Sequence, residues 1–161
     1  MKYTRVIKYP KPYTVGDVLK IALEKEKQSY KFYDGLLKEA KEFKLFSTVK
    51  RLRDSEGVHV KIIQRMLESE KNQAVGVRVT KFKKYATKEK YNKPATFEDA
   101  LKLALARQKS AADFYNSFYK QMFGNTENLS LLVVLKKLDK AEKGHVMIVE
   151  RLLKSKVFWL L

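Results

Sequence analysis

The chain has 161 residues, 45% of them apolar, and a formal charge of +17. This size fits one domain with a substantial core and excludes disordered and fibrous proteins. Because the chain has no cysteine, disulfides, thiolate catalysis, iron–sulfur clusters and cysteine-rich zinc sites are excluded, and any metal must have oxygen and nitrogen ligands.

The start of the chain is a basic arm, residues 1–14, which carries +4 and no acid. It lacks the apolar core of a signal peptide, and no later run approaches the roughly 18 apolar residues of a membrane span. We therefore expect a soluble, cytoplasmic protein. Abundant Lys and Glu without Cys also resembles the composition of thermophile proteins.

Helical periodicity then recurs four times. Six glycines and three prolines are few for an all-β chain, which needs frequent turns. The periodic stretches are 15–41, 45–70, 97–123 and 128–155. Short connections inside each pair and a long one between the pairs predict an all-α four-helix bundle made of two hairpins, spanning residues 15–155.

Helix boundaries are marked by particular residues. Thr14 and Thr96 stand at two helix starts, where a hydroxyl can accept a hydrogen bond from a free amide, and Asp17 and Asp99 follow in the first turns. Gly124 is expected to end the third helix.

The long connection, residues 71–95, is predicted to run as a crossover along the outside of the bundle. Its stretch 75–79 favours a short extended piece, and its part 71–93 carries +7. Residues 156–161 form an apolar C-terminal tail.

The two halves of the chain repeat. Residues 17–23 align with 99–105 at an offset of 82, and Phe32-Tyr33 then falls on Phe114-Tyr115. One hairpin is therefore used twice.

Each helix has an inward stripe that recurs in steps of three and four residues. Every stripe is apolar at both ends and polar in its middle. The stripes are Leu19, Ala22, Glu26, Ser29, Tyr33, Leu36, Ala40; Val49, Leu52, Glu56, His59, Ile63, Met66; Leu101, Ala104, Gln108, Ala111, Tyr115, Phe118, Met122; and Leu135, Leu138, Glu142, His145, Val149, Leu152.

The polar middles predict a metal site. Buried carboxylates without a positive partner are costly, and no Lys or Arg lies in any stripe, so a bound cation is the simplest neutraliser. Glu56 with His59, and Glu142 with His145, are spaced i to i+3, which places both side chains on one helical face. The alternative is a polar core without metal that is satisfied by mutual hydrogen bonds.

Tyr33 and Tyr115 lie on the stripes near this site. They could act as radical or hydrogen-bonding residues beside a metal, but packing is the expected role of an aromatic residue at such a position. Gly57 and Gly144 interrupt helices, which fits either close approach of a neighbour or simple tolerance.

Two Glu-x-x-His pairs in repeat register, with Glu26 on the first helix, resemble the di-iron carboxylate pattern of the ferritin-like superfamily, and its rubrerythrin-like branch most closely. The resemblance implies that Glu26 and His59 bind one metal, Glu56 and Glu142 bridge, and His145 binds the second. Gln108 occupies the position where the family has another carboxylate, which implies a weaker second site.

The resemblance also implies a function. It indicates an oxidoreductase that acts on peroxide, dioxygen or ferrous iron, with iron as cofactor; manganese or zinc could use the same ligands. Without a cysteine-rich rubredoxin segment, electrons must come from another protein. Related bundles pair, so a homodimer is one expectation.

An alternative function follows from the charge. Segments 1–14 and 71–93 mix basic residues with aromatic ones, as surfaces that bind RNA, DNA or ribosomes do. In this hypothesis the bundle is a scaffold with a degenerate metal site, and binding depends on Lys81, Lys83, Lys84, Lys88, Lys90 and Lys93.

Overall fold

A computed structural model describes residues 13–70, 78–79 and 94–155. Four long helices dominate it: α1 (Val15–Glu42), α2 (Phe46–Glu70), α4 (Phe97–Met122) and α5 (Leu129–Lys154). Each begins and ends within one residue of its range expected from periodicity. The predicted all-α four-helix bundle is confirmed.

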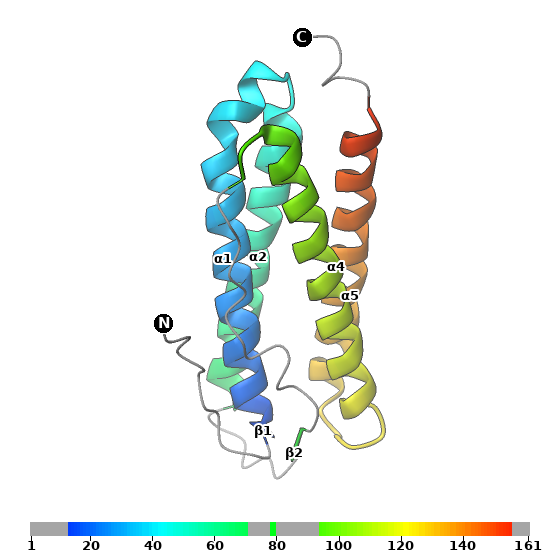
Figure 1. The fold of residues 1–161 in the computed structure, drawn as a ribbon. Coiled ribbons are helices and arrows are strands. Elements are labelled where there is room, and N and C mark those ends of the chain that lie inside the picture. The colour runs from blue at the N-terminus through cyan, green and yellow to red at the C-terminus, as the bar shows by residue number, and fades with distance from the viewer. Residues whose placement is uncertain (1–12, 71–77, 80–93, 156–161) are drawn as a thin grey trace, which may run out of the picture.

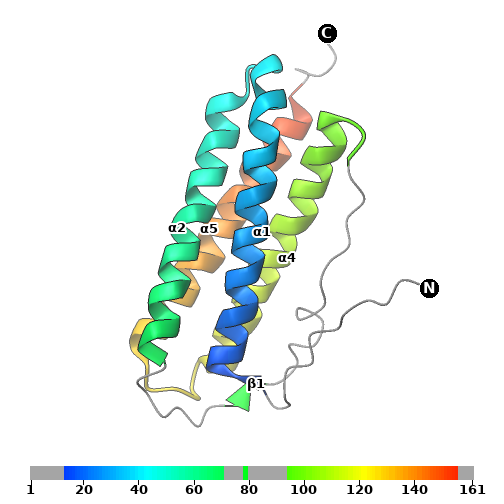
Figure 2. The ribbon, with the colours of Figure 1, turned by 90° about the vertical axis from the view of Figure 1, so that its left-hand side faces the viewer.

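The helices pack as two hairpins. α1 lies against α2 along its length, and α4 lies against α5 in the same way. The hairpins then meet through α1 with α4 and α2 with α5, and Figure 2 shows α1 in front, between α2 and α4. α2 ends and α4 begins at opposite ends of the bundle (Figure 1), which is the arrangement that a long crossover requires.

Two short strands lie at one end of the bundle (Figure 1). β1 (Tyr13–Thr14) pairs antiparallel with β2 (Arg78–Val79), with Tyr13 opposite Val79 and Thr14 opposite Arg78. The short extended piece expected in the crossover is therefore present. The rest of the basic arm, the remainder of 71–93 and the tail 156–161 lie outside the described residues.

The predicted helix starts are capped as expected. Thr14 Oγ1 accepts a hydrogen bond from the backbone N–H of Asp17 at 3.1 Å, and the backbone N–H of Thr14 donates one to Oδ2 of Asp17 at 3.0 Å. Thr96 Oγ1 accepts from the Asp99 N–H at 3.0 Å. After α4, Gly124 adopts a φ of +81°, a left-handed conformation that favours glycine and that stops the helix.

The core consists of two apolar clusters, one toward each end of the bundle. Of the predicted stripe residues, all are buried except Ser29, Met66 and Ala111, which are half-buried. The polar middles of the stripes therefore form a layer between the two apolar clusters. Among the described residues, none of the helices combines the length and the apolar character that a membrane crossing needs.

The two interrupting glycines have different explanations. A Cβ at Gly57 would lie 3.3 Å from the ring of Tyr30, so the small residue makes room for that aromatic side chain. At Gly144 a Cβ would meet nothing within 4 Å, so glycine there is merely tolerated.

Candidate metal centre

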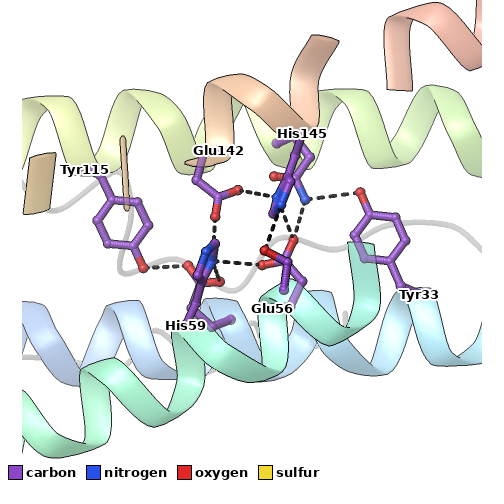
Figure 3. Close-up of polar contacts among 9 residues, drawn as sticks. Tyr33, Glu56, His59, Tyr115, Glu142 and His145 are labelled. Atoms are coloured by element: carbon purple, nitrogen blue, oxygen red, sulfur yellow. Dashed lines mark hydrogen bonds and ion pairs between the residues drawn. The ribbon is translucent and has the colours of Figure 1, made fainter. Parts of the chain in front are cut away.

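A layer of six buried polar side chains crosses the middle of the bundle, and every helix contributes to it. None of the six is more than 6% exposed: Glu26 from α1, Glu56 and His59 from α2, Gln108 from α4, and Glu142 and His145 from α5. Figure 3 shows the two histidines at the centre, with Tyr33 and Tyr115 on opposite sides. Residues far apart in the sequence are thus brought together.

One histidine nitrogen faces three carboxylates. His59 Nδ1 lies 2.8 Å from Oε1 of Glu142, 3.3 Å from Oε2 of Glu26 and 3.3 Å from Oε2 of Glu56. A single N–H can donate to only one of these oxygens at full strength. The arrangement therefore gathers more acceptors than one proton can satisfy.

The second histidine faces two of the same acids. His145 Nδ1 lies 3.4 Å from Oε1 of Glu56 and 3.5 Å from Oε2 of Glu142. Both glutamates therefore turn one oxygen toward each histidine, and the two rings lie nearly parallel with centroids 5.6 Å apart. The layer thus contains two neighbouring positions that share Glu56 and Glu142.

The two tyrosines contact the outer members of the layer. Tyr115 donates a hydrogen bond to Oε1 of Glu26 at 2.5 Å, while Gln108 Nε2 donates to Tyr33 Oη at 3.1 Å and to Oε1 of Glu56 at 2.6 Å. Their rings also belong to the two apolar clusters. Packing and contact with the polar layer are both part of their structure.

Burial and repulsion favour the protonated form of Glu26. Removal from water raises the pKa of Glu26 well above its usual range, and the nearby carboxylates of Glu142 and Glu56 raise it further. Burial likewise raises the pKa of Tyr115, with the charge of Glu26 adding to the effect. The hydroxyl of Tyr115 therefore keeps its proton and acts as a donor.

The pKa values of both histidines are raised, although burial alone would lower them. Burial alone would lower the pKa of His59, but hydrogen bonds to Glu142, Glu26 and Glu56 outweigh it and raise the pKa to about 12. The same balance, with hydrogen bonds to Glu142 and Glu56, raises the pKa of His145 to about 9. Protons on these two rings thus provide positive charge for the metal-free layer, while a proton on Glu26 removes a negative charge from it.

Hydrogen bonds also outweigh the effect of burial on the pKa of Glu56. Desolvation would raise the pKa of this carboxyl, yet the bonds from His145 and His59 lower it far below its usual range. Glu56 is therefore ionised at neutral pH.

The donor set fits a transition metal. Ligand atoms of Glu26, Glu56, His59 and Glu142 lie within 4.8 Å of one another. Since two atoms that bind one ion at about 2 Å are at most about 4 Å apart, small side-chain shifts would bring all four onto one ion. Glu56 Oε2, Glu142 Oε1 and His145 Nδ1 are buried and have an oppositely charged group within 3.5 Å, yet none of them makes a well-oriented hydrogen bond. An ion between them would satisfy all three. Carboxylate and imidazole together suit iron, manganese and zinc.

The family model for Rubrerythrin matches residues 17–153, which cover the four helices except the first two residues of α1 and the last residue of α5. The chain belongs to the rubrerythrin family. Comparisons with curated proteins and with solved structures found no match. The buried layer fits a ferritin-like metal site, because it lies inside a four-helix bundle and consists of acids and imidazoles from facing helices.

Two polar residues of this rubrerythrin-family bundle were not found by sequence reasoning. Ser55 Oγ lies 3.0 Å from His145 Nε2, a contact between α2 and α5. Asp139 is 2% exposed and pairs with Lys143 at 2.8 Å. Neither lies on an inward stripe, so helical spacing gives no indication of either.

Proposed function

We propose that this protein is an iron-dependent oxidoreductase that acts on peroxide, on dioxygen or on ferrous iron. The observation that supports the proposal best is the orientation of the Glu56 and Glu142 carboxylates. Each has one oxygen toward His59 and the other toward His145. Carboxylates placed in this way can bridge two metal ions.

The two positions would bind metal unequally. Glu26 and His59 would complete the first position beside the bridging acids. His145 would serve the second, where Gln108 stands in place of a carboxylate. A neutral amide is a poorer ligand for a hard cation, and the amide nitrogen of Gln108 already donates to Glu56 Oε1 at 2.6 Å. We therefore expect the second position to bind more weakly.

Iron in this layer would supply electrons and an open coordination position for reducing an O–O bond. The protein's part is to exclude water with the flanking apolar clusters and to fix the acids, Glu26 through the Tyr115 hydroxyl. Reduction of hydrogen peroxide to two waters consumes two electrons and two protons. Because the chain has no cysteine for a rubredoxin-type centre, a separate donor protein would have to replace the electrons.

The test is to load the protein with Fe²⁺ without oxygen, measure iron per chain, and then measure peroxide consumption. Glu142→Gln keeps the shape but removes a bridging charge, so iron content and turnover should fall together. Asp139→Asn is the matched control, because it changes another buried acid of the same helix outside the layer. Turnover that persists in iron-free protein would contradict the proposal.

The alternative function is binding of nucleic acid or ribosomes through the basic segments. Its specific support is the β1–β2 pairing, which joins residues 13–14 of the arm to residues 78–79 of the crossover. The candidate residues Lys81, Lys83, Lys84, Lys88, Lys90 and Lys93 lie outside the described residues.

This alternative predicts RNA affinity that falls steeply with salt and after neutralisation of Lys81, Lys83 and Lys84 to Gln. Neutralising three exposed bundle lysines, Lys120, Lys137 and Lys140, is the matched control. Equal losses for both sets, or binding that is indifferent to salt, would count against it.

A further inference from the structure

A small pocket opens between α1 and α4, where the two hairpins meet. Its volume is about 20 Å³. Its walls include Lys25 and Ser29 from α1 and Arg107, Ser110 and Ala111 from α4, and Glu26 of the polar layer also lines it. The two helices lie side by side in Figures 1 and 2.

Several residues of the pocket wall are equivalent in the internal repeat of the chain. Lys25 and Arg107 are equivalent at the offset of 82, and so are Ser29 and Ala111. The equivalent of Glu26 is Gln108, which does not line the pocket. The opening therefore leads to one side of the polar layer, the side of Glu26 and His59.

The opening exists because the side chains that border it are small. Ser29, Ser110 and Ala111 are half-buried, and none of them is long enough to close the space between the two helices. Across the same boundary, the guanidinium of Arg107 lies 5.2 Å from the centroid of the Phe32 ring on α1. That contact holds a positive charge near the pocket.

Size and charge together limit what can enter. A space of this volume accommodates about one water molecule, so a hydrated metal ion or an organic hydroperoxide would not fit. The two basic side chains at the walls outnumber the one acid there, Glu26, whose raised pKa favours its neutral form. The pocket therefore disfavours cations and attracts anions. Small neutral or anionic molecules remain.

We propose that this pocket is the entry for a small oxidant of the hydrogen peroxide or superoxide class to the Glu26 side of the centre, and that ferrous ions do not use it. The inference rests on the proposed function and narrows its substrate class.

The absence of native cysteine allows a first test on metal-free protein. In Ser29→Cys, whose half-buried side chain can be reached from the mouth of the pocket, the labelling rate with an anionic methanethiosulfonate is compared with that of a cationic one. These reagents are too large to enter the pocket, so they measure the charge at its mouth. The same ratio for Ser130→Cys, at an exposed position of α5, is the reference. We expect the anionic reagent to be favoured at position 29 by about threefold or more over the reference, and Arg107→Gln to reduce that preference. Equal ratios at the two positions would overturn the assigned charge selectivity.

A second test uses iron-loaded protein and azide, a small anionic probe. Ala111→Leu should fill the pocket and slow azide association about tenfold, while Ala106→Leu, on the exposed face of the same helix, should not. Iron per chain and thermal unfolding are measured for both variants. Unchanged azide association in an iron-loaded, folded Ala111→Leu variant overturns the entry route.

The tests separate the two proposals. If the protein binds no iron, the proposed function fails while the thiol experiment still decides the charge selectivity at the mouth of the pocket. If iron and turnover are present but neither variant affects access, the function stands and the entry route is wrong.

Discussion

Tyr115 on α4 donates its phenolic hydrogen to Oε1 of Glu26 on α1, across the boundary between the hairpins. The equivalent pair in the repeat is Tyr33 on α1 with Gln108 on α4, in which the amide nitrogen donates to the tyrosine. Each hairpin thus supports the outer polar residue of the other. The pairs differ because one partner is an acid and the other is an amide.

This difference predicts unequal effects of removing the two hydroxyls. Tyr115→Phe leaves Glu26 without its donor, and loss of such a supporting hydrogen bond lowers metal affinity by about 10- to 100-fold. Tyr33→Phe is the matched control, and we expect a smaller loss because its partner is an amide. Iron titration of both variants measures the effect, and equal losses would contradict the unequal roles.

Gln108→Glu should convert the weaker position into a stronger one. The new carboxylate would replace a neutral donor beside Glu56 and His145 with the ligand type that a hard cation prefers. We expect iron content to rise from near one per chain toward two, measured by elemental analysis after removal of loosely bound metal. Gln108→Leu should show no rise. A glutamate variant with unchanged stoichiometry would show that Gln108 does not limit the second position.

Much of the bundle follows from the spacing of apolar residues, because a helix buried on one face must repeat its inward residues every three or four positions. The stripes also placed the acids and histidines in the interior, since each polar residue stood between apolar ones. Ser29 and Ala111 are less buried than a stripe implies. They border the opening between the hairpins. How closely two helices approach depends on the packing of both, so the spacing of residues within one helix does not predict it.

The buried pair of Asp139 with Lys143 shows a second limit. Asp139 lies just off the α5 stripe, beside Leu138, and its burial depends on how neighbouring side chains cover that face. The contact of Ser55 with His145 joins residues 90 positions apart. Such pairings depend on tertiary packing, so helical periodicity could not predict them.

Metal binding should release protons and strengthen as the pH rises. The pKa values of about 12 for His59 and about 9 for His145 mean that both rings hold a proton at neutral pH in the metal-free layer, and the raised pKa of Glu26 favours its protonated form as well. A metal must displace these protons, so acid opposes binding, and affinity should rise about tenfold per pH unit for each proton released. Calorimetry between pH 6 and 8, in two buffers with different ionisation enthalpies, counts the protons. Affinity that is flat over this range would contradict the expectation.

Replacement of His59 should destabilise the metal-free protein strongly. Its Nδ1 lies within 3.3 Å of oxygens from three buried acids, and His59→Leu would leave those acids without their shared positive partner. Removing one member of a buried ion pair costs about 3–5 kcal/mol, measured here as the free energy of unfolding in urea. His145→Leu is the matched control with a smaller expected loss, because His145 Nδ1 faces only two of the acids, at 3.4 and 3.5 Å. Equal stability of the two variants would mean that the acids are neutralised by their own protons and that neither imidazolium is needed.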